Sequence, residues 1–252
     1  MNKELYLERI GLAGTEIDTD LASLRRLQHS HLSSVPFENL DIHWKRPIIP
    51  NLDRFYDKIV GERRGGFCYE LNGLFNELLR SLGFQTRLIS ARVSKGGVPG
   101  REYDHAAIIV SLGDDEYLVD VGFGEFTTEP LAFMLDQVQT DRSGDFIIRR
   151  YDDEYFEVAK RDGDNWVPEY IFKDIERELS EFAEMCDFQQ YSPESHFTKG
   201  KLCSILTSDG RKTLTDQKFI VRAGANTEVN EVVSNEEFEK LLDDEFNIRP
   251  LQ

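Results

Sequence analysis

A cysteine at the start of a predicted helix is the side chain best placed for nucleophilic chemistry in this sequence. Cys68 follows the glycine pair Gly65–Gly66 and shares a helix face with Leu71 and Phe75, which are predicted to pack inward. The unpaired N–H groups of a first helical turn and the helix dipole favour an anion. We therefore expect the pKa of the Cys68 thiol to lie below its usual value of about 8.5. The alternative is a buried free cysteine that acts as a small hydrophobic side chain.

A histidine and an aspartate on a predicted β-hairpin are candidates for the base and its orienting group. His105 begins the apolar strand HAAIIV, and Asp120 interrupts the apolar segment YLVDVGFG. If Gly113 and Asp114 form a two-residue turn, Asp120 lies opposite Ala107, and His105 is two residues away on the same face. Such diagonal neighbours are roughly 7–8 Å apart at the backbone, within reach of a side-chain hydrogen bond. Taken singly, the histidine could instead bind a backbone carbonyl, and the aspartate could cap the following turn.

The apolar pattern predicts the elements that position these side chains. From Leu71 to Leu82 the apolar residues recur with helical spacing, and Gly83 follows where a glycine often ends a helix. Between residues 84 and 172, short alternating segments separated by turn signals predict antiparallel strands of a barrel or a sandwich. The remaining predicted elements are a helix capped by Thr19 or Asp20, a short helix after Asn51, a helix or irregular connection at 176–192, strands at 201–224 and a final helix from Ser234.

Composition narrows the class of protein. The chain has 252 residues and a net charge of −17, which argues against nucleic acid as a general partner. The three cysteines, Cys68, Cys186 and Cys203, are widely spaced, so neither a disulfide framework nor a metal site is expected. We find no secretory signal and no apolar run of the roughly 20 residues needed to span a bilayer. A cytoplasmic protein without membrane association is therefore predicted.

Four segments together resemble the arylamine N-acetyltransferase family: VPFENLDI, RRGGFCYELN, DHAAIIV and YLVDVGFG. The resemblance is strong over residues 5–130, weakens over 131–190 and returns in SPESHFTKGKLCSILTSDGRKTL. One departure is Asp104, where relatives more often carry an uncharged polar residue. The resemblance implies an α+β fold with a cysteine-protease-like Cys-His-Asp core. Its three domains would be a helical bundle (1–83), a β-barrel (84–192) and a small α/β lid (193–252).

The resemblance also implies roles for individual residues. Cys68, His105 and Asp120 match the catalytic triad of the family. Glu38 and Arg64 are expected to form a structural ion pair behind the nucleophile. The residues predicted to bind substrate are Phe37, Phe67, Val93, Phe123 and Gly124. The aromatic members would hold an aryl ring by burial and edge-to-face contacts.

The activity implied is transfer of an acetyl group from acetyl-CoA to an aromatic amine or hydrazine, in a ping-pong reaction through an acetyl-cysteine. Acetyl-CoA would be a co-substrate, with no tightly bound cofactor, and the protein would be a monomer or a homodimer. The coenzyme site is not located by the sequence: SKGGVPGRE carries Lys95 and Arg101, but a flexible connection explains this segment equally well. Three alternatives remain open: a thiol hydrolase or transglutaminase-like enzyme, an amide synthase that uses a carrier-bound acyl donor, and a binding module with an inactive triad.

Overall fold

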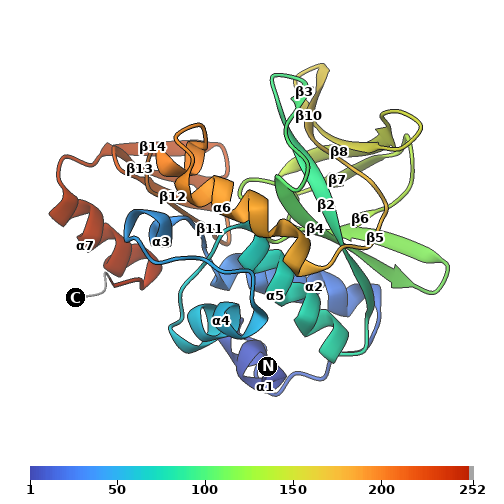
Figure 1. Ribbon diagram of the computed structural model, residues 1–252, viewed down its shortest axis with the longest axis horizontal. Helices are drawn as coiled ribbons and strands as arrows, with labels where there is room; N and C mark the ends of the chain where they lie inside the picture. The colour runs from blue at the N-terminus through green and yellow to red at the C-terminus, as the bar shows by residue number, and fades with distance from the viewer. Residues whose placement is uncertain (250–252) are drawn as a thin grey trace.

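The computed structural model describes residues 1–249 and confirms the predicted α+β class. Figure 1 shows three parts: a nearly closed barrel, a second sheet covered by the last helix, and a group of N-terminal helices beneath and between them. Three hydrophobic cores match these parts, one under the helices, one inside the barrel and one between the second sheet and its helix. Among residues 1–249, no helix is long and apolar enough to cross a membrane.

The helices begin and end at the residues that local chemistry predicts. Asp20 accepts a hydrogen bond from the Ser23 backbone N–H at 2.8 Å, and Asn51 does the same for Arg54. Gly83 follows the helix Cys68–Ser81 with φ of +96°, a conformation that glycine adopts without strain. The α-helices are α1 (Lys3–Arg9), α2 (Leu21–Ser34), α3 (Leu40–His43), α4 (Leu52–Tyr56), α5 (Cys68–Ser81), α6 (Ala183–Tyr191) and α7 (Asn235–Phe246), with a π-helical turn at Asp57–Gly61 and 3-10 turns at Leu179–Phe182 and His196–Thr198.

The barrel is an antiparallel sheet in the order β6-β5-β4-β2-β10-β9-β8-β7. Its edge strands β6 and β7 are bridged by the Gln139 side chain, which binds both backbone groups of Ala132 at 2.7 and 2.8 Å. The strands are β2 (Gln85–Lys95), β3 (Val98–Pro99), which pairs only with β2, β4 (His105–Leu112), β5 (Asp115–Val119), β6 (Leu131–Ala132), β7 (Val138–Asp141), β8 (Gly144–Arg150), β9 (Phe156–Asp162) and β10 (Asn165–Phe172).

The β4–β5 hairpin has the predicted register. Leu112 pairs with Asp115 and Ile108 with Val119, so Gly113 forms part of a two-residue turn, with φ of +65°. Strand β4 is buried on both faces, because Ile108 and its even-numbered neighbours pack toward the helices while the odd-numbered residues face the barrel interior. This double burial explains why the segment reads as a continuous apolar run.

The second sheet has the order β1-β11-β12-β13-β14. Its strands are β1 (Phe37–Glu38), β11 (Leu202–Leu206), β12 (Gly210–Thr215), β13 (Lys218–Ala223) and β14 (Asn226–Glu231). Strand β1 comes from the N-terminal region and pairs with β11, so Phe37 lies opposite Ser204. The N-terminal region thus contributes an edge strand to the last sheet, which the sequence pattern did not reveal. The predicted domain boundaries after residues 83 and 192 stay predictions.

Candidate active site

Cys68 is the first residue of α5 and lines a cavity of about 540 Å³ between the barrel, α6 and the second sheet. Only 3% of its surface is exposed. The Gly122 backbone lies directly against it: a Cβ built on Gly122 would come within 2.8 Å of the Cys68 Cα and 2.7 Å of the Asn72 Nδ2. A glycine is therefore required for the loop after β5 to approach the start of the helix this closely.

The predicted lowering of the thiol pKa is wrong. Burial raises the pKa of the Cys68 thiol well above its ordinary value, the Asp104 carboxylate raises it further, and a hydrogen bond from the Ala106 backbone only partly opposes them. The sequence placed Cys68 at a helix terminus but did not show how deeply it is buried, and burial has the larger effect on the thiol pKa. The thiol therefore needs a base that can take its proton before it can act as a nucleophile.

His105 and Asp120 form a buried hydrogen-bonded pair at the cavity that Cys68 lines. The His105 Nε2 lies 2.7 Å from the Asp120 Oδ2, and the two residues are 2% and 1% exposed. His105 lines the same cavity as Cys68. No hydrogen bond joins the Cys68 sulfur to His105 within residues 1–249, so the two side chains meet only as walls of that cavity. The structure thus brings together the three side chains that the sequence singled out.

The Asp120 carboxylate is held by four donors. Its Oδ2 accepts from His105 and, at 3.2 Å, from the Tyr170 hydroxyl, while its Oδ1 accepts from the Asn72 Nδ2 at 2.8 Å and the Gly122 N–H at 2.9 Å. A buried carboxylate with this many donors is held in one orientation. The fixed position of Oδ2 in turn holds the His105 imidazole ring in one orientation.

Asn72 is a site residue that sequence reasoning missed. It lies one helical turn after Cys68, is fully buried, and also donates to the Ala106 carbonyl at 2.6 Å and accepts from the Val121 N–H at 2.9 Å. A single amide thus links α5 to β4 and to the segment that carries Asp120. The available signal was a polar residue at position i+4 on the inward-facing side of the helix.

Three of the five predicted substrate-binding residues line the cavity: Phe37, Val93 and Phe123. Phe67 does not, because its ring is fully buried and packs edge-on against Tyr69, with centroids 4.9 Å apart. Gly124 also lies outside the cavity lining; it occupies the turn after Phe123, with φ of +94°. The structure therefore places these two residues away from the cavity lining, and their roles in substrate binding stay predictions.

The segment 188–199 supplies cavity walls that the sequence did not indicate. Phe188 and Phe197 add aromatic surface to the cavity, and the Phe197 ring lies next to that of Phe37, with centroids 6.1 Å apart. The cavity also has a cationic part, formed by Lys95 and Lys199 with Arg101. In residues 1–249 the two lysines have no carboxylate within ion-pair distance, whereas Arg101 binds Glu194 at 2.8 Å and stacks on Phe188.

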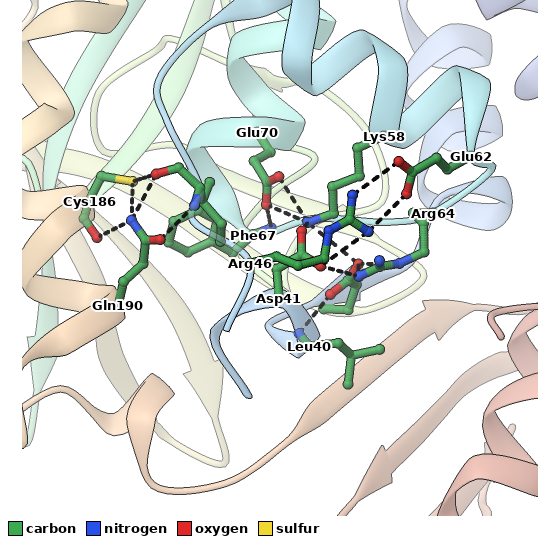
Figure 2. A network of polar contacts seen from close by, with 12 residues as sticks. Leu40, Asp41, Arg46, Lys58, Glu62, Arg64, Phe67, Glu70, Cys186 and Gln190 are labelled. Atoms are coloured by element: carbon green, nitrogen blue, oxygen red, sulfur yellow. Dashed lines mark hydrogen bonds and ion pairs between the residues drawn. The ribbon is translucent and has the colours of Figure 1, made fainter. Parts of the chain in front are cut away.

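A buried cluster of charges lies beneath the start of α5 (Figure 2). The predicted ion pair is present, with the Arg64 Nη2 2.7 Å from the Glu38 Oε1 and 2.9 Å from the Asp41 Oδ1. Lys58, which sequence reasoning missed, lies 2.9 Å from both Asp41 and Glu70. The cluster therefore contains three carboxylates and two cations, all excluded from water. Loss of one partner of such a group leaves an uncompensated buried charge.

Glu70 connects this cluster to the residue that precedes Cys68. Its Oε2 accepts a hydrogen bond from the Phe67 backbone N–H at 3.0 Å, which fixes the residue immediately before Cys68. Burial raises the pKa of Glu70 to about 7, against the opposing effect of Lys58. For Lys58, burial acts to lower the pKa, but Glu38, Glu70 and Asp41 raise it more, so the ammonium stays charged.

Comparisons with known proteins identify the family of this chain. A family model described as N-acetyltransferase matches residues 20–251. An arylamine N-acetyltransferase from Mycolicibacterium smegmatis is 33% identical over 230 residues, which cover 88% of this chain and 83% of that protein. The chain therefore belongs to the arylamine N-acetyltransferase family and is an acyltransferase.

Two solved structures are similar over nearly the whole chain. The Mycobacterium marinum arylamine N-acetyltransferase in complex with CoA has a TM-score of 0.89 and 29% identity, covering 98% of this chain and 93% of that one. An arylamine N-acetyltransferase from Bacillus cereus, described as having a unique Cys-His-Glu catalytic triad, has a TM-score of 0.91 and 25% identity, covering 99% and 100%. In this chain the carboxylate hydrogen-bonded to His105 belongs to an aspartate, Asp120.

Proposed function

We propose that the protein transfers an acetyl group from acetyl-CoA to the nitrogen of an arylamine or arylhydrazine, with Cys68, His105 and Asp120 as its catalytic triad. The observation that carries the proposal is the shared cavity, in which a buried thiol faces an imidazole held by a fully hydrogen-bonded carboxylate. Asp120 orients His105 and stabilises the imidazolium that forms when His105 takes the thiol proton. Residues Glu38, Arg64 and Lys58 support the start of α5 from below.

The reaction then proceeds in two half-reactions. The Cys68 thiolate attacks the thioester carbonyl, CoA leaves as a thiol after taking the proton from His105, and acetyl-Cys68 remains. The amine nitrogen attacks this second thioester, His105 removes a proton from the nitrogen, and the Cys68 thiol is regenerated. Backbone N–H groups at the start of α5 donate to the developing oxyanion. Because one cavity serves both steps, CoA leaves before the amine reacts, which is a ping-pong order.

Two features of the cavity support this choice of substrates. Its aromatic walls, formed by Phe37, Phe123 and Phe197, suit a planar aryl ring. Its cationic part, formed by Lys95 and Lys199 in a strongly acidic protein, suits the phosphates of a nucleotide-bearing donor. The CoA complex of the Mycobacterium marinum relative agrees with a donor of this class.

Intact-mass spectrometry tests the proposal. Incubation with acetyl-CoA alone should add one acetyl group, which maps to Cys68 and is absent in Cys68→Ser. Addition of an aniline should remove the adduct and yield the acetanilide, and initial rates should give parallel double-reciprocal lines. An adduct that decays equally fast in water and in aniline would instead indicate a hydrolase. Labelling only by a carrier-bound acyl chain would indicate an amide synthase.

A further inference from the structure

Asp104 presents a carboxylate to the active-site cavity that the acetyl-transfer steps do not use. It lines the same cavity as Cys68 and His105. Its Oδ1 accepts a hydrogen bond from the Gln189 Nε2 at 2.7 Å, and Gln189, itself buried, accepts from the Ser195 hydroxyl at 2.6 Å. The carboxylate is therefore held in place by Gln189, and Gln189 is held in turn by Ser195.

The surrounding chain leaves room for this carboxylate but provides no countercharge in contact with it. A Cβ built on Gly100 would lie 2.6 Å from the Asp104 Oδ2, so the glycine provides the space. No lysine, arginine or histidine lies within ion-pair distance of Asp104 in the part of the chain that the structure describes. Asp120, by contrast, is bound to His105 and to three further donors.

The charge of Asp104 reaches the reacting sulfur. After burial, Asp104 is the largest cause of the raised pKa of the Cys68 thiol, ahead of Asp120. Burial also raises the pKa of Asp104 itself. A carboxylate in a partly desolvated cavity interacts more strongly with a second charge than it would in water.

We propose that Asp104 is a specificity-determining residue that selects acceptors by charge. It favours amines and hydrazines that bring a cationic group or extra N–H donors into the cavity, and it disfavours arylamines that carry a carboxylate. Lys95 and Lys199 line the same cavity, and the proposed function assigns them to the donor phosphates. This inference rests on the proposed function for its substrates, but the electrostatic role of Asp104 can be measured without it.

The first experiment measures the potential at Cys68 with two alkylating agents of similar size. Iodoacetamide is neutral and iodoacetate is anionic, so the ratio of their rate constants at Cys68, at pH 8, is independent of the fraction of thiolate. We expect Asp104→Asn to raise the iodoacetate-to-iodoacetamide ratio roughly three- to tenfold, the size of effect that one unit charge exerts at the effective dielectric of a partly buried site. Peptide mapping assigns the label to Cys68, with Cys68→Ser as the blank.

The matched control is Glu102→Gln. It makes the same change in net charge two residues away, but Glu102 lies outside the cavity lining and contacts Arg92 and Tyr155. Its ratio should stay within about twofold of the parent. If Asp104→Asn fails to fold, as judged by circular dichroism, Asp104→Thr takes its place. An unchanged ratio in a folded Asp104 variant, or an equal change in Glu102→Gln, overturns the proposal.

The second experiment measures acceptor selectivity with 4-aminobenzoate, 4-aminobenzamide and 4-(aminomethyl)aniline, which carry charges of −1, 0 and +1. In the parent protein, kcat/KM should rise along this series. Asp104→Asn should reduce the ratio between the cationic and anionic acceptors by roughly tenfold, mainly through KM. Selectivity that is the same in both proteins overturns the proposal. If the parent acetylates none of the three, the proposed function fails, and the alkylation ratio still decides the role of Asp104.

Discussion

Replacement of Asn72 by alanine tests whether one buried amide holds the two halves of the site together. The substitution removes the donor to the Asp120 Oδ1 and leaves the Val121 N–H without its acceptor, in a position that no water reaches because Asn72 is fully buried. Each buried polar group left unsatisfied costs about 1–3 kcal/mol. We therefore expect Asn72→Ala to lower the free energy of unfolding by about 2–5 kcal/mol.

The same substitution should reduce acetyl transfer without abolishing it. Asp120 keeps its contacts to His105, Tyr170 and Gly122, so the imidazole remains paired but less firmly placed. A displacement of the catalytic group by a fraction of an ångström lowers kcat on the order of tenfold or more. KM for acetyl-CoA should change little, because Asn72 does not line the cavity.

Asn76 provides the matched control on the same helix. It lies one turn further along α5, is only 7% exposed, and its amide oxygen has no hydrogen-bond partner within residues 1–249. Urea unfolding should place Asn76→Ala within about 1 kcal/mol of the parent, because no polar group loses a partner. The reasoning is refuted if Asn72→Ala is no less stable than Asn76→Ala, or if its kcat equals that of the parent.

Three further predictions follow from the same contacts. Cys68→Ser should abolish acetyl transfer and Cys203→Ser should retain it, because of these two thiols only that of Cys68 lines the cavity. Liquid chromatography of the acetylated product measures both activities. Full activity in Cys68→Ser would show that the nucleophile is misassigned. Gly122→Ala should lower kcat at least about tenfold, because the Cβ of the alanine would lie 2.8 Å from the Cys68 Cα and displace it. An unchanged kcat in a folded variant would contradict this prediction. Burial raises the pKa of Glu70 to about 7 from an ordinary value of 4.5, so its contribution to stability is complete below about pH 4.5 and is lost as the pH rises through 7. In urea unfolding from pH 5 to 8, the free energy of unfolding of the parent should fall by about 3 kcal/mol more than that of Glu70→Gln. Parallel pH profiles of the two proteins would refute the assignment.

Local sequence was sufficient to predict the elements whose structure depends on residues close together in the chain. The apolar spacing from Leu71 to Leu82 and the terminal Gly83 predicted α5, because a helix with one inward face needs only that periodicity. The turn at Gly113 placed His105 and Asp120 on one face, because register in a two-residue hairpin is set by the turn itself.

Tertiary packing decided the properties that depend on distant parts of the chain. Neither the burial of Cys68 nor the charge of Asp104 beside it follows from position at a helix terminus, so the direction of the thiol pKa shift was predicted wrongly. The ring of Phe67 turned into the core because Tyr69 offers it an aromatic partner there.

The sequence by itself thus singled out Cys68, His105 and Asp120 as the candidate nucleophile, base and orienting carboxylate, because each lies in a short segment with its own local signal. Only the tertiary structure showed that Asn72 links them, that residues 188–199 close the cavity, and that Lys58 joins the predicted ion pair of Glu38 and Arg64. These contacts join segments far apart in the chain, and their energies come from desolvation and geometry, which residue spacing does not encode.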